Sequence, residues 1–547
     1  MAQIKTQPQG PGTWSPLQHR VFLAIWLASI ISSIGSQLQQ VGAAWLMTSL
    51  ARSPEMVALV TALSTLPILL FSLPAGALAD ILDRRLVLLG AQILMLLASG
   101  VLAGLAFAGL VTPALLLLLT FVVGSGQAIM APAWQSTVGD LVPREKVPHA
   151  VGLNTMGFNI ARTLGPALGG VLVAALGSSV NFALNAVSYL ALIAVLMNWR
   201  PERRAAMDSD SVFAAMRDGV TYALHSAPVR RVILRAMCFG FCSSIVVALM
   251  ALVARDLLHH GATVFGLLMG CMGIGAVIGA AQLGRLRNRF SGEVLIRLAI
   301  VVTSAALAGI GLSRYLPLTC LALFVVGAGM VLGLSTFNVS VQMNVPRWVS
   351  GRALALYQMF TFGGMTLGAW NWGHVAERVG IGPTYMICSA VLFSTLLLAW
   401  RLPVEEVHSS ALTSAPHEDE HELPEAPQGA GVSGGVVVVI EYIVPAAKLD
   451  DFLAAVTARQ HIRIRDGARK VTLLQDATNA ELWAERFQVR SWAEYLRQRQ
   501  RRTLEAKEYD DFLSQCHRGP QPPLTRFYFE HRAGPDSGET LVSYPLG

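Results

Sequence analysis

Residues 56–85 read MVALVTALSTLPILLFSLPAGALADILDRR, a charge-free run of 24 residues that ends in a short, strongly charged loop. A helix needs about 20 mostly apolar residues to cross the hydrocarbon of a bilayer, because ionised groups in lipid cost several kcal/mol. The run therefore predicts one membrane span, and the same criterion finds twelve in the chain. They are residues 21–51, 56–79, two within 86–139, two within 147–199, 236–254, 257–284, 298–313, 315–345, 353–376 and 379–400.

The composition agrees with a polytopic membrane protein. The 547-residue chain has a mean hydropathy of +0.52 and is 14% charged, against about a quarter in soluble proteins. Residues 1–401 hold 25 Lys/Arg and 12 Asp/Glu, whereas residues 402–547 hold 16 and 22. An ordinary cytosolic enzyme and a mostly disordered chain are excluded, and two different kinds of polypeptide meet near residue 401.

The distribution of Lys and Arg predicts the orientation, because these residues are retained on the cytoplasmic side. With the N-terminus inside, twenty of them fall in cytoplasmic segments and only Arg52, Arg255, Arg314 and Arg378 in outer loops. Both ends of the membrane part are therefore expected on the cytoplasmic side. The basic balance reflects topology and anionic lipid, and no nucleic-acid partner is expected.

The first 400 residues contain an internal repeat. FVVGSG at 121–126 recurs as FVVGAG at 324–329, and the same offset of 203 residues relates Val142-Pro143-Arg144 to Val345-Pro346-Arg347. Each half holds six predicted spans, an even number, so the halves insert in the same orientation. We expect them to be related by an axis along the membrane normal, with a central cavity between them.

The charged loop after the second span carries the first motif. Gly76 allows two helices to approach closely, Asp80 can sit at a helix end, and Arg84 and Arg85 can pair with that acid or with phosphate. With Asp83, these residues predict a latch that holds the cytoplasmic side shut in one state. A simple positive-inside anchor would use the same arginines. The spacing resembles the loop signature of the major facilitator superfamily.

The fifth span carries the second motif, made of Gly152, Gly165-Pro166 and Gly169-Gly170. It resembles the fifth-helix signature of the superfamily's exporters, with Ala161 where a glycine is usual. Glycine permits tight packing, and Pro166 removes a backbone donor and can kink the helix. The resemblance implies a helix that closes the outer end of the cavity, although a plain packing helix would also use small residues.

Over residues 15–401 the chain resembles most the branch that includes bacterial enterobactin exporters, the transmembrane secretion effectors. The shared features are the loop at 76–85, Pro143-Arg144 and the run from Asn159 to Pro166. The resemblance implies export of a siderophore or a similar small amphipathic metabolite. Proton coupling is expected from the family alone, because no Asp or Glu lies well inside a predicted span.

Arg162 is the only charge deep in the predicted spans, whereas drug exporters of the superfamily usually carry an arginine where this chain has Thr120. An ionisable group within the membrane is a functional-site hypothesis, so Arg162 either binds an anionic substrate group or donates to backbone carbonyls. Uncharged polar residues in the spans suit hydroxyls, amides or rings of a substrate, or bond between helices. The predicted substrate cavity comprises Arg162, Gln37, Gln40, Asn159, Asn338 and Gln358.

From residue 402 the pattern changes. Residues 402–432 hold seven acids and no Lys or Arg, which predicts an unstructured linker. The H-E-x-x-H match at 417–421 lies in this solvated run, so no metal site is expected. Residues 433–547 predict a β-α-β-β-α-β domain with strands 436–443, 471–475, 482–489 and 525–529 and helices 446–462 and 491–516. This order is ferredoxin-like and resembles the dimeric antibiotic-biosynthesis monooxygenases, a likeness that transfers no catalytic residue.

The sequence thus predicts an all-α polytopic membrane protein of twelve transmembrane helices in two six-helix pseudo-repeats, followed by a small α+β ferredoxin-like domain. The expected parts are the cytoplasmic N-terminus 1–20, a first half 21–199, a central loop 200–229, a second half 230–401, the linker 402–432 and the tail domain 433–547. The expected activity is secondary active export of a small-molecule substrate by rocking of the halves, with protons as partner. No catalytic residue, metal or cofactor is expected, and the tail domain is expected to regulate or to form a homodimer.

Three other functions fit the sequence. One is an importer of the same fold, and another is a membrane-tethered monooxygenase acting through the tail domain. The third is a sensor that transports nothing. No G-x-x-x-x-G-K-[ST] loop occurs, so an ion gradient would have to drive active transport.

Overall fold

The computed structural model describes residues 15–51, 53–199, 220–346, 349–404, 435–500, 502–519 and 521–530. The chain forms two compact units, and each is described by itself. The first comprises Met1–Arg217, Pro228–Gln342 and Gly351–Glu406. The second comprises Asp218–Ala227, Met343–Ser350 and Val407–Gly547.

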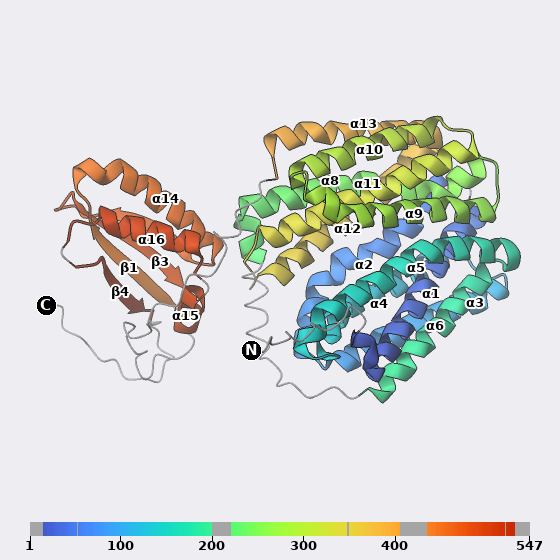
Figure 1. Cartoon of the computed structure of the whole chain (residues 1–547), viewed down its shortest axis with the longest axis horizontal. Coiled ribbons are helices and arrows are strands. Elements are labelled where there is room, and N and C mark those ends of the chain that lie inside the picture. Colours follow the sequence, from blue (N-terminus) through green and yellow to red (C-terminus); the bar gives the residue numbers. More distant parts are fainter. Residues whose placement is uncertain are drawn as a thin grey trace, which may run out of the picture. The chain divides into compact units, whose positions relative to one another are not determined.

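Long helices make up the described part of the first unit (Figure 1). Eleven of the described helices are long and apolar enough to cross a membrane, and the exception is α12, which is 30 residues long but richer in polar residues. The bounds are α1 Arg20–Leu50, α2 Pro54–Ile81, α3 Arg84–Phe107, α4 Pro113–Asp140, α5 Val147–Leu176, α6 Ser178–Asn198, α8 Ala227–Leu252, α9 Ala262–Arg287, α10 Gly292–Leu312, α11 Leu316–Met343, α12 Ser350–Val379 and α13 Ile381–Arg401.

The predicted breaks within the first half are confirmed by local backbone chemistry. The Thr112 side chain accepts a hydrogen bond from the Leu115 amide, and Pro113 is the first residue of α4, where its missing N–H costs nothing. Gly177 ends α5 with a φ of +83°, and Gly380 ends α12 with a φ of +86°. These two glycines are 203 residues apart, and the bounds of α4, α5 and α6 recur in α11, α12 and α13 at the same offset.

The start of the second half differs from the prediction. A span was expected over 236–254 and the next from 257, but α8 begins at Ala227 and continues as a π-helical turn, Val253–Leu257, before α9 begins at Ala262. Arg255, expected in an outer loop, therefore lies in this last helical turn. The prediction was wrong because a charge ends an apolar run without ending the backbone hydrogen bonds of a helix.

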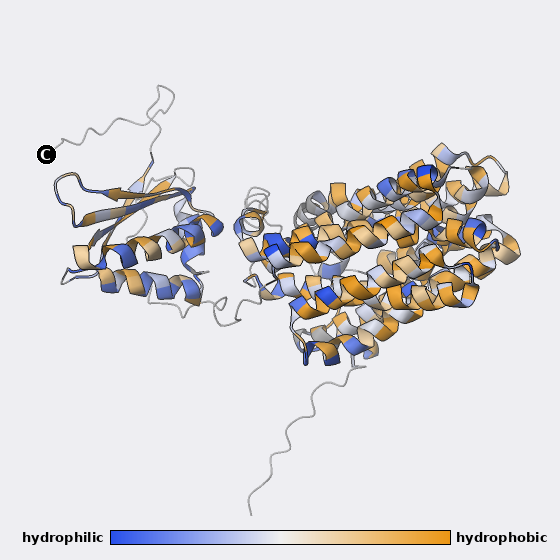
Figure 2. Ribbon diagram, turned by 90° about the horizontal axis from the view of Figure 1, so that it is seen from above, coloured by the Kyte–Doolittle hydropathy of each residue, from blue (hydrophilic) through white to orange (hydrophobic). Residues whose placement is uncertain are grey.

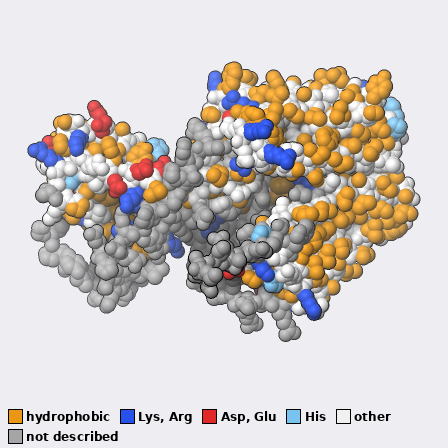
Figure 3. All heavy atoms as spheres, in the orientation of Figure 1, with side chains coloured by type: hydrophobic (Ala, Val, Ile, Leu, Met, Phe, Trp, Pro, Cys, Tyr) orange, Lys and Arg blue, Asp and Glu red, His pale blue; other side chains and the backbone are white. Residues whose placement is uncertain are grey.

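Large apolar side chains remain exposed on the outside of the helices, among them Leu97, Leu164, Val187, Leu321 and Leu397. Figure 2 marks the apolar residues along the helices of this unit, and Figure 3 shows apolar side chains over much of its visible surface. Burial of such surface from water would be worth about 25 cal/mol per Å². A lipid bilayer provides an apolar surrounding for these side chains, as expected of a membrane protein.

The second unit contains a four-stranded sheet in the order β2-β3-β1-β4, in which every neighbouring pair is antiparallel. The strands are β1 Val436–Ile443, β2 Arg469–Gln475, β3 Leu482–Val489 and β4 Leu524–Phe529. Helices α14 (Leu449–Arg465) and α16 (Leu504–Cys516) pack on one face of the sheet, with Tyr442, Phe452 and Leu513 in the core (Figure 1). The predicted order of elements is thus observed with one exception.

The exception is the single helix predicted over 491–516, which is two helices, α15 (Trp492–Gln500) and α16. The Thr503 hydroxyl accepts a hydrogen bond from the Ala506 amide and starts α16 anew. Trp492 and Tyr495 of α15 then turn onto the end of the sheet, where both rings contact Phe527. The linker residues 405–432, including the H-E-x-x-H match, lie outside the described residues.

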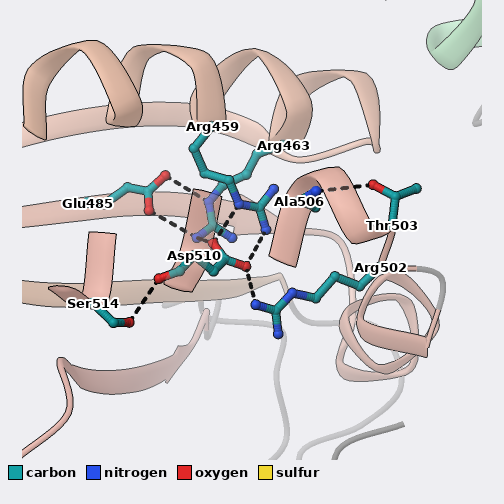
Figure 4. Close-up of polar contacts among 8 residues, drawn as sticks. All are labelled: Arg459, Arg463, Glu485, Arg502, Thr503, Ala506, Asp510 and Ser514. Carbon is teal, nitrogen blue, oxygen red and sulfur yellow. Dashed lines mark hydrogen bonds and ion pairs between the residues drawn. The ribbon is translucent and has the colours of Figure 1, made fainter. Parts of the chain in front are cut away.

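A buried ion cluster joins α14, α16 and β3 (Figure 4). Asp510 accepts two hydrogen bonds from Arg459, at 2.6 and 3.0 Å, and pairs with Arg502 at 2.7 Å. Glu485, which is fully buried, accepts two from Arg463, at 2.7 and 3.0 Å. Since these are fork-shaped pairs between elements distant in sequence, they set how the two helices sit on the sheet.

Candidate functional site

Helix α5 places Arg162 on the inner side of the helical unit. At about 100° of rotation per residue, the exposed Leu164, Leu168 and Val171 share one side of α5. Arg162 and Pro166 lie on the opposite side of the helix. The lipid-facing side of α5 is thus apolar, and its single charge points toward the interior.

Arg162 borders a solvent-accessible space. The side chain is surrounded by many protein atoms, and a substantial part of its surface is nevertheless accessible to solvent. Among the described residues, no hydrogen bond or ion pair holds its guanidinium. Among these residues, Arg162 therefore does not act as a donor to backbone carbonyl oxygens, the alternative role. Its five N–H donors remain free for a ligand.

The glycines of α5 bring the helix against two neighbours. A Cβ added at Gly165 would lie 2.5 Å from Cβ of Gln37, and one at Gly169 would lie 3.1 Å from Cβ of Val41, so both positions serve close packing on α1. On the other flank, a Cβ at Gly170 would lie 2.2 Å from Cα of Gly266 on α9. The close approach predicted for this helix is confirmed at these three glycines.

Two glycines of the predicted motifs do not serve close packing in this structure. A Cβ added at Gly152 or at Gly76 would meet no heavy atom within 4 Å. The expectation that Gly76 allows two helices to approach closely is therefore wrong for the described residues.

The predicted latch loop makes local contacts in this structure. Asp83 caps α3 by accepting a hydrogen bond from the Arg85 amide at 2.9 Å. The Arg85 guanidinium donates to the carbonyl oxygens of Leu196 and Met197, at 2.9 and 2.7 Å, where a cation is favourable at the end of α6. The Arg84 side chain is half-buried and also takes part in a polar or electrostatic interaction. The side chain of Asp80 lies outside the described residues.

The remaining predicted cavity residues are spread over the helices of both halves. Gln37 packs on Gly165, and Gln40 and Gln358 are half-buried. Asn338 accepts a hydrogen bond from Gln342, one turn later on α11, at 2.6 Å. The side chain of Asn159 lies outside the described residues. Among the residues that the structure describes, no hydrogen bond or ion pair joins any of these to Arg162, so a shared cavity remains a prediction.

The two halves are joined at the end where α1 ends and α2 begins, the outer end in the predicted topology. Glu55 on α2 accepts a hydrogen bond from Trp370 at 3.1 Å and lies 3.3 Å from His374, both on α12. Ser53 donates to Glu377 at 2.7 Å. Arg255 donates to the Thr48 carbonyl oxygen. Together with the Gly170–Gly266 crossing, these contacts hold the two halves together at this end.

Sequence reasoning missed two sets of polar residues. Glu55 follows Pro54 at the start of α2, which is an ordinary helix start, and nothing in the sequence pairs it with a residue more than 300 positions away. Gln39 was also overlooked beside Gln37 and Gln40. It is buried and accepts from Ser99 at 2.6 Å and from Asn185 at 2.5 Å, which ties α1, α3 and α6 into one unit.

Replacing Glu55 with Gln should loosen the outer end, because the uncharged amide is a weaker partner for His374 and for the Trp370 N–H. We expect amide exchange in residues 46–57 to become about 3- to 10-fold faster. A matched control is Glu145→Gln, since Glu145 is exposed and precedes α5 at the other end of the helices. Equal exchange in both variants would show that Glu55 does not hold the halves together.

Comparison with known proteins assigns the family. The model of the family described as transmembrane secretion effector matches residues 11–534. The chain belongs to this family. It is a transporter of the major facilitator superfamily, and its relatives are transporters rather than enzymes. The match begins and ends beyond the predicted 15–401, so the family pattern reaches into the tail domain.

Two curated relatives are similar over the helical part. The chain is 23% identical over 392 residues to the multidrug efflux pump Tap of Mycolicibacterium fortuitum. The aligned region covers 70% of this chain and 95% of the pump. It is 26% identical over 367 residues to the enterobactin exporter EntS of Citrobacter koseri. That aligned region covers 64% of this chain and 84% of the exporter.

A solved structure shows the same fold. It is a bacterial homologue of the human lysosomal transporter Spinster in an inward-facing, unoccupied conformation. The TM-score is 0.53 at 17% sequence identity, over 71% of this chain and 95% of that chain. The helical unit therefore has the major facilitator fold.

Proposed function

We propose that this transporter exports a small amphipathic metabolite with an anionic group, such as a siderophore, from the cytoplasm across the inner membrane. The observation that carries the proposal is Arg162, a free guanidinium deep in the helical unit that borders a solvent-accessible space. A guanidinium binds a carboxylate or phosphate through two parallel hydrogen bonds. The efflux activities named for its relatives favour the outward direction.

The state of the halves is one that an exporter passes through when it loads its substrate from the cytoplasm. Contacts of Glu55, Ser53 and Arg255 hold the outer end closed. With N- and C-terminal ends of the helical unit in the cytoplasm, as the Lys and Arg distribution predicts, the space beside Arg162 then takes its substrate from the cytoplasm. Rocking of the halves would open it outward, with the loop at 76–85 as the inner latch.

Proton coupling is part of the proposal. Deep in the described spans there is no Asp or Glu to carry a proton, whereas Glu55 and His374 face each other between the halves at the outer end. Opening of the outer end must break this contact. Pairing of two tail domains into a homodimer stays a prediction.

The test is comparative metabolite profiling of medium and cells that express the intact protein, Arg162→Ala or Arg162→Lys. We expect one class of anionic compounds to be enriched in the medium at least about 10-fold with the intact protein, to be lost in Arg162→Ala and to be partly restored in Arg162→Lys. Arg289→Ala serves as the matched control, because Arg289 is exposed in the turn after α9.

Two outcomes would overturn the proposal. Enrichment inside the cells would make the protein an importer. Export that continues unchanged in Arg162→Ala would remove Arg162 from the substrate site.

A further inference from the structure

The second compact unit contains more than the tail. Besides Val407–Gly547 it includes Asp218–Ala227 and Met343–Ser350. The first of these segments ends the connection between α6 and α8, which joins the two halves. The second connects α11 to α12. Segments of two connections of the transporter thus fold together with the tail domain.

Within this unit, Tyr222 packs against the tail domain. Its side chain is 1% exposed, and that of the next residue, Ala223, is also 1% exposed. The Arg465 guanidinium lies over the Tyr222 ring, 5.2 Å from the ring centre. A cation over an aromatic face is attracted by the negative face of the ring, most strongly where water is excluded.

The guanidinium that meets Tyr222 is held in place by two acids. Arg465, the last residue of α14, pairs at 3.3 Å with Asp466 and at 3.3 Å with Glu505 in the first turn of α16. Burial raises the pKa of the Tyr222 hydroxyl. The charge of Arg465 lowers this pKa, and the carboxylates of Asp466 and Glu505 raise it further. All three charges therefore lie close enough to act on the tyrosine.

We propose that the tail domain is an intramolecular brace, which grips the connection between the two halves through the Tyr222–Arg465 contact and stabilises the state closed at the outer end. The connection is attached to α6 in one half and to α8 in the other. Rocking changes the distance between its two attachment points, so a grip on it favours one state over the other.

The experiment measures amide exchange in the full-length protein in detergent, with Tyr222→Leu, Arg465→Met and the double variant. We expect each single variant to speed exchange in residues 220–226 about 10-fold and at the outer end, in residues 46–57 and 370–377, about 3-fold. The double variant should change no more than either single one, because both remove the same contact. Tyr222→Phe keeps the ring and should behave as the unaltered protein.

The control is Arg518→Met, which removes an exposed arginine 3.9 Å from Glu481 in the same unit. Two results would show that the Tyr222–Arg465 contact does not hold this segment. One is unchanged exchange in residues 220–226, and the other is a double variant in which the effects of the two single variants multiply. Faster exchange in residues 220–226 without any change at the outer end would contradict the proposal that the tail domain acts as a brace. The inference rests on the proposed transport by rocking, but exchange is read without substrate, so failure to find a substrate would leave this result standing.

Discussion

Gly170→Ala should reduce transport at least about 5-fold while the amount of protein in the membrane stays the same. The new methyl group would lie 2.2 Å from Cα and 2.6 Å from the amide nitrogen of Gly266. These are backbone atoms, so the clash is relieved only by moving α5 away from α9. Overpacking of this kind costs about 1–3 kcal/mol, which disfavours the closed outer end about 5- to 150-fold.

The measurement pairs export with amide exchange at the outer end. Gly266→Ala should reproduce the effect from the other helix, since its Cβ would lie 2.6 Å from Cα of Gly170. Gly100→Ala on α3 is the control, because a Cβ there meets no heavy atom within 4 Å and alanine is the better helix former. Normal export by Gly170→Ala would show that the α5–α9 crossing does not limit the cycle.

Asp510→Ala should destabilise the tail domain by about 3 kcal/mol, the low end for breaking a buried ion pair, since the carboxyl is partly exposed. The carboxylate pairs with three arginines, Arg459, Arg463 and Arg502, and offsets part of their mutual repulsion (Figure 4). Limited proteolysis of the full-length protein, read on peptides from 435–530, measures the loss. Asp511→Ala is the control, because Asp511 is exposed on the same helix and should change stability by less than about 0.5 kcal/mol.

The same residue predicts a response to acid. Burial alone would raise the pKa of the Asp510 carboxyl, but Arg459 and Arg463 outweigh burial and hold it below its ordinary value. A carboxyl with a lower pKa in the folded state adds stability above about pH 4, and the contribution is lost as the pH falls through the lowered pKa. Asp510→Asn should therefore flatten the acid sensitivity of the tail domain. An identical pH profile in both proteins would contradict this account.

Some features followed from the sequence because they depend on one segment at a time. The breaks at Pro113 and Gly177 were predicted, since a proline and a glycine with positive φ act on their own backbone. The order of strands and helices along the tail domain followed from short apolar runs such as 436–443 and 482–489. Arg162 stood out because a charge inside an apolar run is visible without any neighbour.

Other features could not be read from the sequence. Gly76 and Gly170 are both glycines in motifs, and only their surroundings show that the second is tightly packed and the first is not. Gln39 was indistinguishable from Gln37 and Gln40 until Ser99 and Asn185 were found beside it. The split between α15 and α16 also depended on how Trp492 and Tyr495 fit the end of the sheet.

The sequence by itself determined that this protein is a membrane transporter built of long helices with a small α+β tail. Lipid and water act on each segment separately, so length, apolarity and charge are enough to place a helix in the bilayer. The tertiary structure alone decided which residues join the two halves at one end, leave Arg162 free and join Tyr222 to the tail domain. Those contacts arise between residues far apart in the chain, and their geometry depends on both partners.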